Sequence, residues 1–361
     1  MARLLLHIGA HKTATSYIQR LFHLNRDIIK EHGIIYPDVG NNPGHHILVT
    51  PWIAVPEIPE SAYGKRSLYQ RMLRKNLSDA FFERLVKKHA RQEGTVFISA
   101  EIFSRAEPQR VDMQDLARRL SPFEDVKIVY TVRHQIDYIQ SIWLQVAKNG
   151  PAPRFNQFLD HAIQQKLASG LWVEHGKVID HVLTGFSADK LIILDYESIR
   201  RHPEGTAGPF LDLMNASLRF KDLKNIDRRE ANISPDPLAS LLAHSICWPS
   251  PMKPNLMKKL QQAIEEIRKE HAKNRTTLYT REEYKRVDEA FLRDNSNLSN
   301  WLQIERANAK VTGPTSTETL LFREDLTVSD WKILAYEAEI PDWRILARKA
   351  GVYSGTTGLS P

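Results

Sequence analysis

The sequence contains a single cysteine, Cys247, so the chain cannot form an internal disulfide. A chain of 361 residues can bury enough surface to fold without one, which fits a reducing compartment. No apolar run approaches the roughly 20 residues needed to span a membrane. The opening run of leucines, residues 4–6, is too short for a signal peptide and lacks a cleavage site. We therefore expect a cytoplasmic protein.

Several common catalytic patterns are also missing. There is no set of His and Cys residues at zinc-ligand spacing and no G-x-S-x-G turn, which argues against a zinc enzyme and a serine hydrolase. A Walker A loop would place a glycine before Lys12, but His11 stands there. A kinase or NTPase remains an alternative, which would need a Walker B carboxylate and Mg²⁺.

The charge balance favours anionic partners. Lys and Arg number 50 against 43 Asp and Glu, for a net charge of +7. Residues 65–91 are dense in Lys and Arg and could hold an anionic acceptor or form a solvated helix face. A basic nucleic-acid-binding protein is a second alternative. It would interleave basic residues with exposed aromatics, whereas the aromatics here fall mostly at core positions of predicted helices, so we expect no nucleic-acid partner.

Four short apolar runs predict β-strands, at residues 4–8, 95–99, 126–132 and 190–196. They are mostly apolar rather than strictly alternating, as in parallel strands covered by helices on both faces. Residues 15–30 have helical spacing, and further helical patterns include residues 136–146, 155–163 and 256–267. The alternation predicts an α/β fold with a doubly wound, mostly parallel sheet flanked by helices.

The domain organisation predicted from these patterns has three parts. Residues 1–310 form the α/β domain, and 311–325 form a linker that begins in a polar stretch. Residues 326–361 form a helical C-terminal appendage and tail. One helix includes residues 331–338 and ends near Pro341, and a second, shorter one stops before Gly351.

The first strand runs directly into a turn and a helix, with the sequence GAHKTATSY at residues 9–17. Backbone N–H groups of such a turn, together with the helix N-terminus, can hold an anion. Lys12 adds a point charge, and Thr13, Thr15 and Ser16 add hydroxyl donors.

This turn resembles the 5′-phosphosulfate loop of the sulfotransferases that use 3′-phosphoadenosine 5′-phosphosulfate (PAPS), which commonly reads GxxKTGTT. Ala14 replaces the usual glycine, and Tyr17 falls where cytosolic members often carry a nucleotide-stacking tryptophan. The resemblance implies a P-loop nucleotide-binding fold. It also implies that the donor is bound by Gly9, His11, Lys12, Thr13, Ala14, Thr15, Ser16 and Tyr17.

A second segment resembles the 3′-phosphate site of the same family. The strand at 126–132 is followed by Arg133 and, eight residues later, by Ser141. An arginine at the carboxyl end of a parallel strand faces the ligand crevice, and its guanidinium can pair with a phosphate through two hydrogen bonds. Residues 228–234 resemble the family's loop that closes over the nucleotide. The resemblance implies that Arg229, in this segment, also binds the donor. The expected product is adenosine 3′,5′-bisphosphate.

The resemblance implies transfer of a sulfuryl group from PAPS to a hydroxyl or amine of a carbohydrate, glycolipid or small-molecule acceptor. Lys12 would stabilise the bridging oxygen as the S–O bond breaks, and no metal is expected because sulfuryl transfer develops less charge than phosphoryl transfer. The acceptor needs a general base. His45 and His46 lie where Golgi-type relatives carry a catalytic glutamate, and Glu101 lies where cytosolic relatives carry a catalytic histidine. The sequence leaves these three candidates open.

Overall fold

The computed structural model describes residues 1–40, 42–52, 68–107, 110–214, 217–225, 235–305, 313 and 316–352. The chain divides into two compact units. The first unit comprises Met1–Arg133, Gly170–Ala231 and Asp294–Thr312, and the second comprises His134–Ser169, Asn232–Arg293 and Gly313–Pro361.

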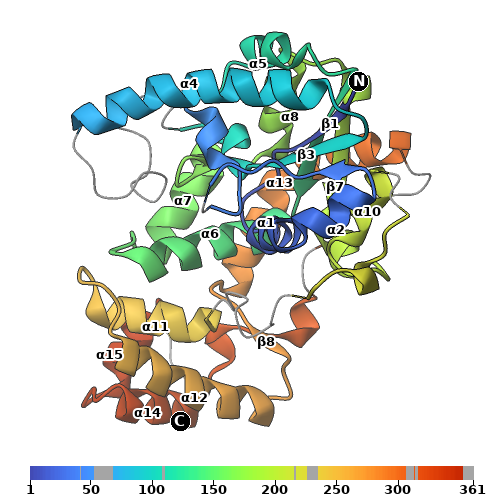
Figure 1. Ribbon diagram of the computed structural model, residues 1–361. Helices are drawn as coiled ribbons and strands as arrows, with labels where there is room; N and C mark the ends of the chain where they lie inside the picture. Colours follow the sequence, from blue (N-terminus) through green and yellow to red (C-terminus); the bar gives the residue numbers. More distant parts are fainter. Residues whose placement is uncertain are drawn as a thin grey trace. The chain divides into compact units, whose positions relative to one another are not determined.

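The first unit is built on a five-stranded sheet in which every paired strand is parallel, in the order β2-β3-β1-β4-β7 (Figure 1). The strands are β1 (Arg3–His7), β2 (Ile34–Ile35), β3 (Thr95–Ser99), β4 (Asp125–Val132) and β7 (Leu191–Asp195). The chain winds outward from β1 to one edge and returns to place β4 on the other side of β1. The carboxyl end of β1 is therefore the point where strand order reverses, and open α/β sheets bind ligands at such points.

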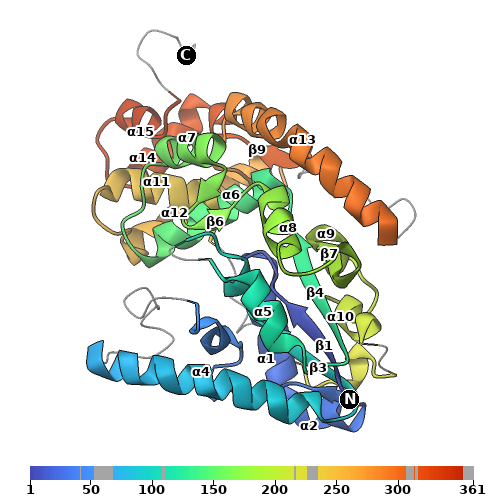
Figure 2. The same cartoon turned by 90° about the horizontal axis from the view of Figure 1, so that it is seen from above.

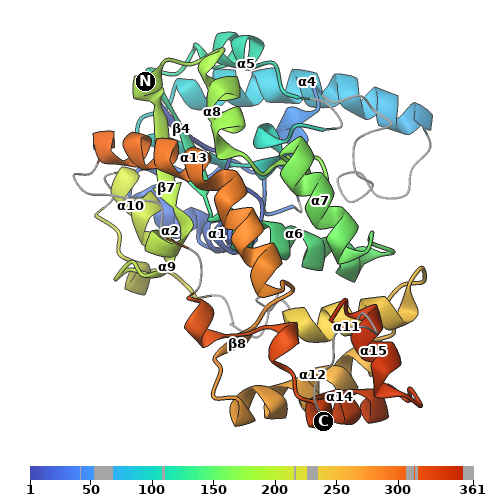
Figure 3. The ribbon, with the colours of Figure 1, turned by 180° about the vertical axis from the view of Figure 1, so that it is seen from behind.

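Helices cover both faces of this sheet. They are α1 (Thr15–Leu24), α2 (Arg26–Glu31), α4 (Leu68–Ala90), α5 (Met113–Leu120), α8 (His175–Leu183), α9 (Tyr196–Arg200) and α10 (Gly208–Leu213). Helices α4, α5 and α8 lie on one side, and α1, α2 and α10 lie on the other (Figures 1 and 3). On the second side the ring of Phe97 in β3 packs 4.8 Å from Phe22 of α1 and 5.7 Å from Phe210 of α10, measured between ring centroids. These buried contacts fix α1 against the sheet.

The structure confirms the predicted α/β class and all four predicted strands. It adds β2, whose two residues are too few for a periodicity signal. The prediction of one helix over residues 15–30 is wrong, because the helix breaks at Asn25. This buried side chain donates to the carbonyl groups of Leu21 and Lys224 and accepts the N–H of Lys224 at 2.7 Å. The Asn25 side chain thus ties the chain at the break to the backbone of Lys224, as short polar side chains do where they bond to backbone groups.

The second unit is mostly helical. It contains α6 (Gln135–Asn149), α7 (Phe155–Gln165), α11 (Pro237–Cys247), α12 (Pro254–Glu270), α14 (Val328–Glu337) and α15 (Trp343–Lys349), with a short parallel pair of β8 (Arg275–Thr276) and β9 (Leu320–Leu321). Helix α13 (Arg281–Glu305) contributes residues to both units. The two predicted C-terminal helices are present as α14 and α15. No helix in the described ranges has the length and apolar character needed to cross a membrane.

The start of α1 has an unusual backbone. Its N-cap residue, Ala14, adopts the left-handed conformation with φ 60° and ψ 18°, and no side chain caps the helix. An L-residue pays roughly 1–2 kcal/mol for this conformation, because its Cβ crowds the following carbonyl, and glycine does not. The family's usual glycine at this position therefore has a physical reason, and the alanine here carries strain.

We predict that Ala14→Gly raises the free energy of unfolding by about 0.5–1 kcal/mol. The relieved strain exceeds the extra entropy that glycine gives the unfolded chain. Urea unfolding at constant m-value measures the change. Ala10→Gly is the matched control, because Ala10 is buried in the same loop without a positive φ and its replacement should destabilise. A loss of stability in Ala14→Gly equal to that of the control would contradict the strain argument.

Candidate active site

The loop between β1 and α1 turns through two left-handed residues, Lys12 with φ 65° and Ala14 with φ 60°. Thr13 between them does not share this conformation. A backbone that alternates in hand points successive N–H groups toward one side and forms a concavity for anions. The Thr13 hydroxyl donates to the Ala10 carbonyl at 2.6 Å, which closes the turn.

Two polar atoms at this loop are buried and have no hydrogen-bond partner within the described part of the chain: the Oγ1 of Thr15 and the Nε2 of His11. The first N–H groups of α1 also lack intrahelical acceptors, and the methyl group of Ala14 cannot cap them. Buried polar groups are seldom left without partners. The loop, the helix N-terminus and these two atoms therefore fit an anionic group such as a phosphosulfate.

Gly9 allows the loop backbone to pass close to the His7 side chain. A Cβ at Gly9 would lie 2.6 Å from the Nε2 of His7, so only glycine allows the backbone to pass there. His7 is fully buried and is held by hydrogen bonds to the hydroxyl groups of Ser99 (3.0 Å) and Thr131 (3.3 Å). Burial lowers the pKa of His7 to about 4, so the ring is neutral near pH 7.

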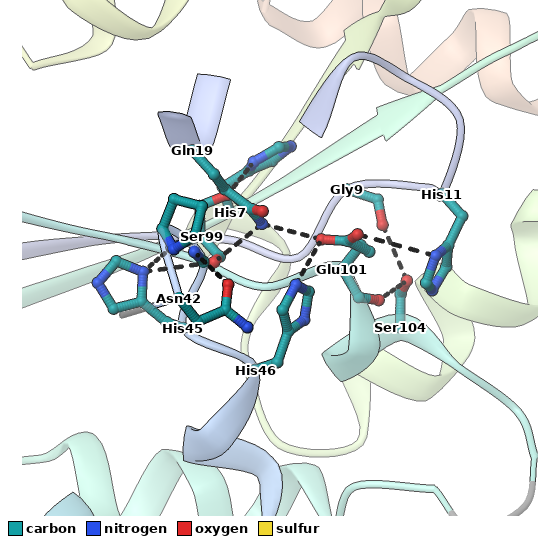
Figure 4. A network of polar contacts seen from close by, with 12 residues as sticks. His7, Gly9, His11, Gln19, Asn42, His45, His46, Ser99, Glu101 and Ser104 are labelled. Atoms are coloured by element: carbon teal, nitrogen blue, oxygen red, sulfur yellow. Dashed lines mark hydrogen bonds and ion pairs between the residues drawn. The ribbon is translucent and has the colours of Figure 1, made fainter. Parts of the chain in front are cut away.

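Glu101 begins a short 3₁₀ helix, η3 (Glu101–Ser104), directly after β3. Its carboxylate accepts a hydrogen bond from the Gln19 side chain at 2.9 Å, with the donor on α1. Its other neighbours are two imidazoles: His11 Nδ1 lies 3.9 Å from Oε1, and His46 Nε2 lies 3.7 Å from Oε2. His11 and His46 flank the carboxylate in Figure 4. The loop after β1, the helix α1, and the start of η1 (His46–Val49) thus meet at the one carboxylate that follows β3.

The charges in this cluster differ from residue to residue. Burial would raise the pKa of Glu101, but the imidazoles of His46 and His11 and the hydrogen bond from Gln19 outweigh it and lower that pKa. Burial lowers the pKa of His11 to about 4 against the attraction of Glu101. At neutral pH the cluster therefore holds an ionised Glu101 beside a neutral His11.

The two adjacent histidines have different environments. His45 is fully buried. Its Nδ1 accepts the N–H of Ser99 at 3.1 Å, and its Nε2 donates to the carbonyl of Pro37 at 3.1 Å. Both ring nitrogens are therefore occupied by backbone groups, and burial lowers the pKa of His45 to about 4. His46 is partly exposed, with 24% of its side chain accessible, and turns one ring nitrogen toward Glu101.

Arg133 follows the last residue of β4. Its guanidinium donates to the Lys12 carbonyl at 3.3 Å and lies over the ring of Tyr196, 5.0 Å from the centroid. Tyr196 begins α9 directly after β7. The carboxyl ends of β1, β4 and β7 thus converge on this arginine.

The remaining predicted site residues have mixed outcomes. Ser16 is exposed at the start of α1, and Tyr17 is partly buried against the core of the first unit. Ser141 lies on α6, in the second unit. Arg229 lies outside the described residues and stays a prediction. No group of three or more His, Cys, Asp or Glu side chains in the described ranges is arranged to hold a metal ion.

Sequence reasoning missed Gln19 and Ser104. Gln19 follows Thr15 by one helical turn, so the signal was its position on the face of α1 that begins at the loop. The Ser104 hydroxyl donates to the Gly9 carbonyl at 2.9 Å and ties η3 to the loop. Neither contact can be read from the sequence without the pairing of β1 with β3.

Comparisons with known proteins agree on one family. Residues 8–292 match the sulfotransferase domain. A search of curated proteins finds no match. Among solved structures, the chain is similar to a sulfotransferase from Alicyclobacillus acidocaldarius at 17% identity and a TM-score of 0.39, covering 82% of this chain and 97% of that one.

Two further structures show similarity at 13% identity. The mouse sulfotransferase SULT7A1 complexed with PAP has a TM-score of 0.36, with 85% of this chain and 89% of that chain covered. The sulfotransferase domain from the Curacin biosynthetic pathway has a TM-score of 0.37, with 73% and 98% covered.

The domain match covers most of the chain and includes the loop after β1, Glu101 and Arg133. The chain therefore belongs to the sulfotransferase domain family, whose members are enzymes that use PAPS as sulfuryl donor.

Proposed function

We propose that this PAPS-dependent sulfotransferase transfers the sulfuryl group to a hydroxyl or amine of a carbohydrate, glycolipid or other polar small-molecule acceptor. The observation that carries the proposal is the left-handed loop at Lys12 and Ala14, with the Thr15 hydroxyl and the His11 Nε2 buried beside it. These groups suit the 5′-phosphosulfate of the donor. The nucleotide's 3′-phosphate is assigned to Arg133.

Lys12 is assigned to the leaving group. As the sulfur–oxygen bond breaks, its electron pair moves onto the bridging oxygen and leaves with adenosine 3′,5′-bisphosphate. The Lys12 ammonium and the loop N–H groups stabilise that developing charge. Arg133 donates to the Lys12 carbonyl, and this contact couples the two phosphate sites.

His46 is assigned as the general base. A proton moves from the acceptor hydroxyl to the ring nitrogen that faces away from Glu101, while the acceptor oxygen bonds to sulfur. The ionised Glu101, 3.7 Å from Nε2, orients the ring and stabilises the imidazolium that forms. The lowered pKa of Glu101 suits it better to this role than to taking the proton itself. His45 has both nitrogens bonded to backbone groups and is assigned a structural role.

The acceptor class is inferred from the surroundings of the base. Gln19, Glu101, His11 and His46 present amide, carboxylate and imidazole groups there, and Figure 4 shows them gathered together. Such groups pair with the hydroxyls of a sugar better than with an apolar ring.

We predict that adenosine 3′,5′-bisphosphate without added metal raises the thermal unfolding midpoint and that ATP with Mg²⁺ does not. A ligand at 100 times its dissociation constant adds about 2.7 kcal/mol to the free energy of unfolding. Arg133→Ala should reduce this shift strongly, leaving only weak binding through the loop after β1. Arg84→Ala, which removes an exposed positive charge on α4, is the control for general anion attraction and should keep it. Stabilisation by Mg-ATP alone would instead support the kinase alternative.

The base assignment predicts the pH dependence of turnover, measured as release of adenosine 3′,5′-bisphosphate from PAPS with the best acceptor from a panel of sugars and phenols. A histidine base must be unprotonated to take the acceptor proton, so turnover falls on the acidic limb of the profile. His46→Gln should lower kcat by about 10²–10⁴. Glu101→Gln should lower kcat by a smaller factor and keep the acidic limb, because His46 remains to take the proton.

The two candidate bases give different results in this experiment. A wild-type limb below about pH 4.5, absent in Glu101→Gln, would identify Glu101 as the base and overturn the assignment to His46. His161→Gln, which changes an exposed residue of α7, serves as the control and should leave the profile as in the wild type.

A further inference from the structure

Arg133 lies in the short connection between β4 and α6, where its carbonyl has no place in either the sheet or the helix. A backbone carbonyl in such a position needs a donor from elsewhere. The donor is the side chain of His175, whose Nε2 lies 2.8 Å from the Arg133 oxygen. Figures 2 and 3 show α8, which begins with His175, running beside β4.

The neighbours of His175 fix its tautomer. A carbonyl can only accept, so Nε2 carries the proton and Nδ1 is left as an acceptor. Nδ1 lies 2.7 Å from the hydroxyl of Tyr130, which therefore donates to it. Tyr130 and His175 are both buried, and burial lowers the pKa of His175. The neutral ring thus joins two points of β4, the Tyr130 side chain and the Arg133 backbone.

His175 is itself held in place by Asp294 on α13. The Asp294 carboxylate accepts the N–H of His175 at 2.9 Å and the N–H of Gly176 at 3.0 Å, and so caps α8. The N-cap residue of α8, Glu174, makes no side-chain cap of its own. A carboxylate at a helix N-terminus also interacts favourably with the helix dipole. The imidazole is therefore fixed at its backbone and at both ring nitrogens.

We propose that His175 is a positioning residue for nucleotide binding: through Tyr130, Asp294 and the Arg133 carbonyl it holds the Arg133 guanidinium in place to receive the 3′-phosphate. The inference rests on the proposed role of Arg133. The guanidinium contacts the Lys12 carbonyl and the Tyr196 ring, so a shift of the Arg133 backbone moves it off both. A small misplacement of a binding group can weaken the interaction strongly.

The test is the dissociation constant of adenosine 3′,5′-bisphosphate, measured by calorimetry on full-length variants. His175→Leu, which removes the donor, should weaken binding about tenfold or more. His175→Gln, whose amide can still donate to the Arg133 carbonyl, should bind within about threefold of the wild type. If His175→Leu does not fold, Tyr130→Phe serves as a second variant, because it keeps the buried ring and removes only the hydroxyl. It should weaken nucleotide binding by a smaller factor than His175→Leu.

The Arg133→Ala background separates positioning from a general loss of structure. If His175 acts through Arg133, His175→Leu causes no further loss there, and the two changes are non-additive. Wild-type affinity in both His175→Leu and Tyr130→Phe would overturn the inference. It would also be overturned if His175→Leu weakened binding in the Arg133→Ala background as much as it does in the wild type. If Arg133→Ala alone binds as the wild type, the proposed role of Arg133 fails first, and the role of His175 fails with it.

Discussion

The left-handed backbone at Lys12 and Ala14 is the constraint on which the site depends. It turns the chain from β1 into α1 within a few residues and gathers loop N–H groups on one side. It also directs the Lys12 carbonyl to the guanidinium of Arg133. The conformation costs strain at two non-glycine residues, and such strain persists where the surrounding structure holds it. Two contacts hold the strained backbone here. Gly9 packs closely against the His7 ring, and the Ser104 hydroxyl donates to the Gly9 carbonyl.

A second feature of the site is the separation of charge among its buried groups. Burial keeps His7, His11 and His45 neutral near pH 7, because each has its pKa lowered to about 4. Glu101 remains ionised among them. The neutral rings therefore build and line the candidate site, and the proposed base, His46, lies partly exposed beside a single negative charge. This arrangement suits transfer of a group whose donor is itself anionic.

The sequence predicted the layout well, because apolar runs and the turn after the first strand are local signals. The four predicted strands match β1, β3, β4 and β7 closely, and the predicted turn and helix follow β1. The break at Asn25 was missed, since it depends on the distant backbone of Lys224. The sequence could not distinguish the environments of His45 and His46. The two differ because only the His45 ring bonds to the backbone groups of Ser99 and Pro37, which are not its neighbours in the sequence. Gln19 and His175 contact residues far away in the sequence, Glu101 and Tyr130 respectively, which residue spacing does not reveal.

The central claim is that one nucleotide is held at both ends, by the loop after β1 and by Arg133. The most direct measurement is a crystal structure with adenosine 3′,5′-bisphosphate. The account predicts the 5′-phosphate against the N–H groups of residues 12–16 and the Thr15 hydroxyl, and the 3′-phosphate on the Arg133 guanidinium. A bound nucleotide with neither phosphate on the loop, or with its 3′-phosphate away from Arg133, would contradict it.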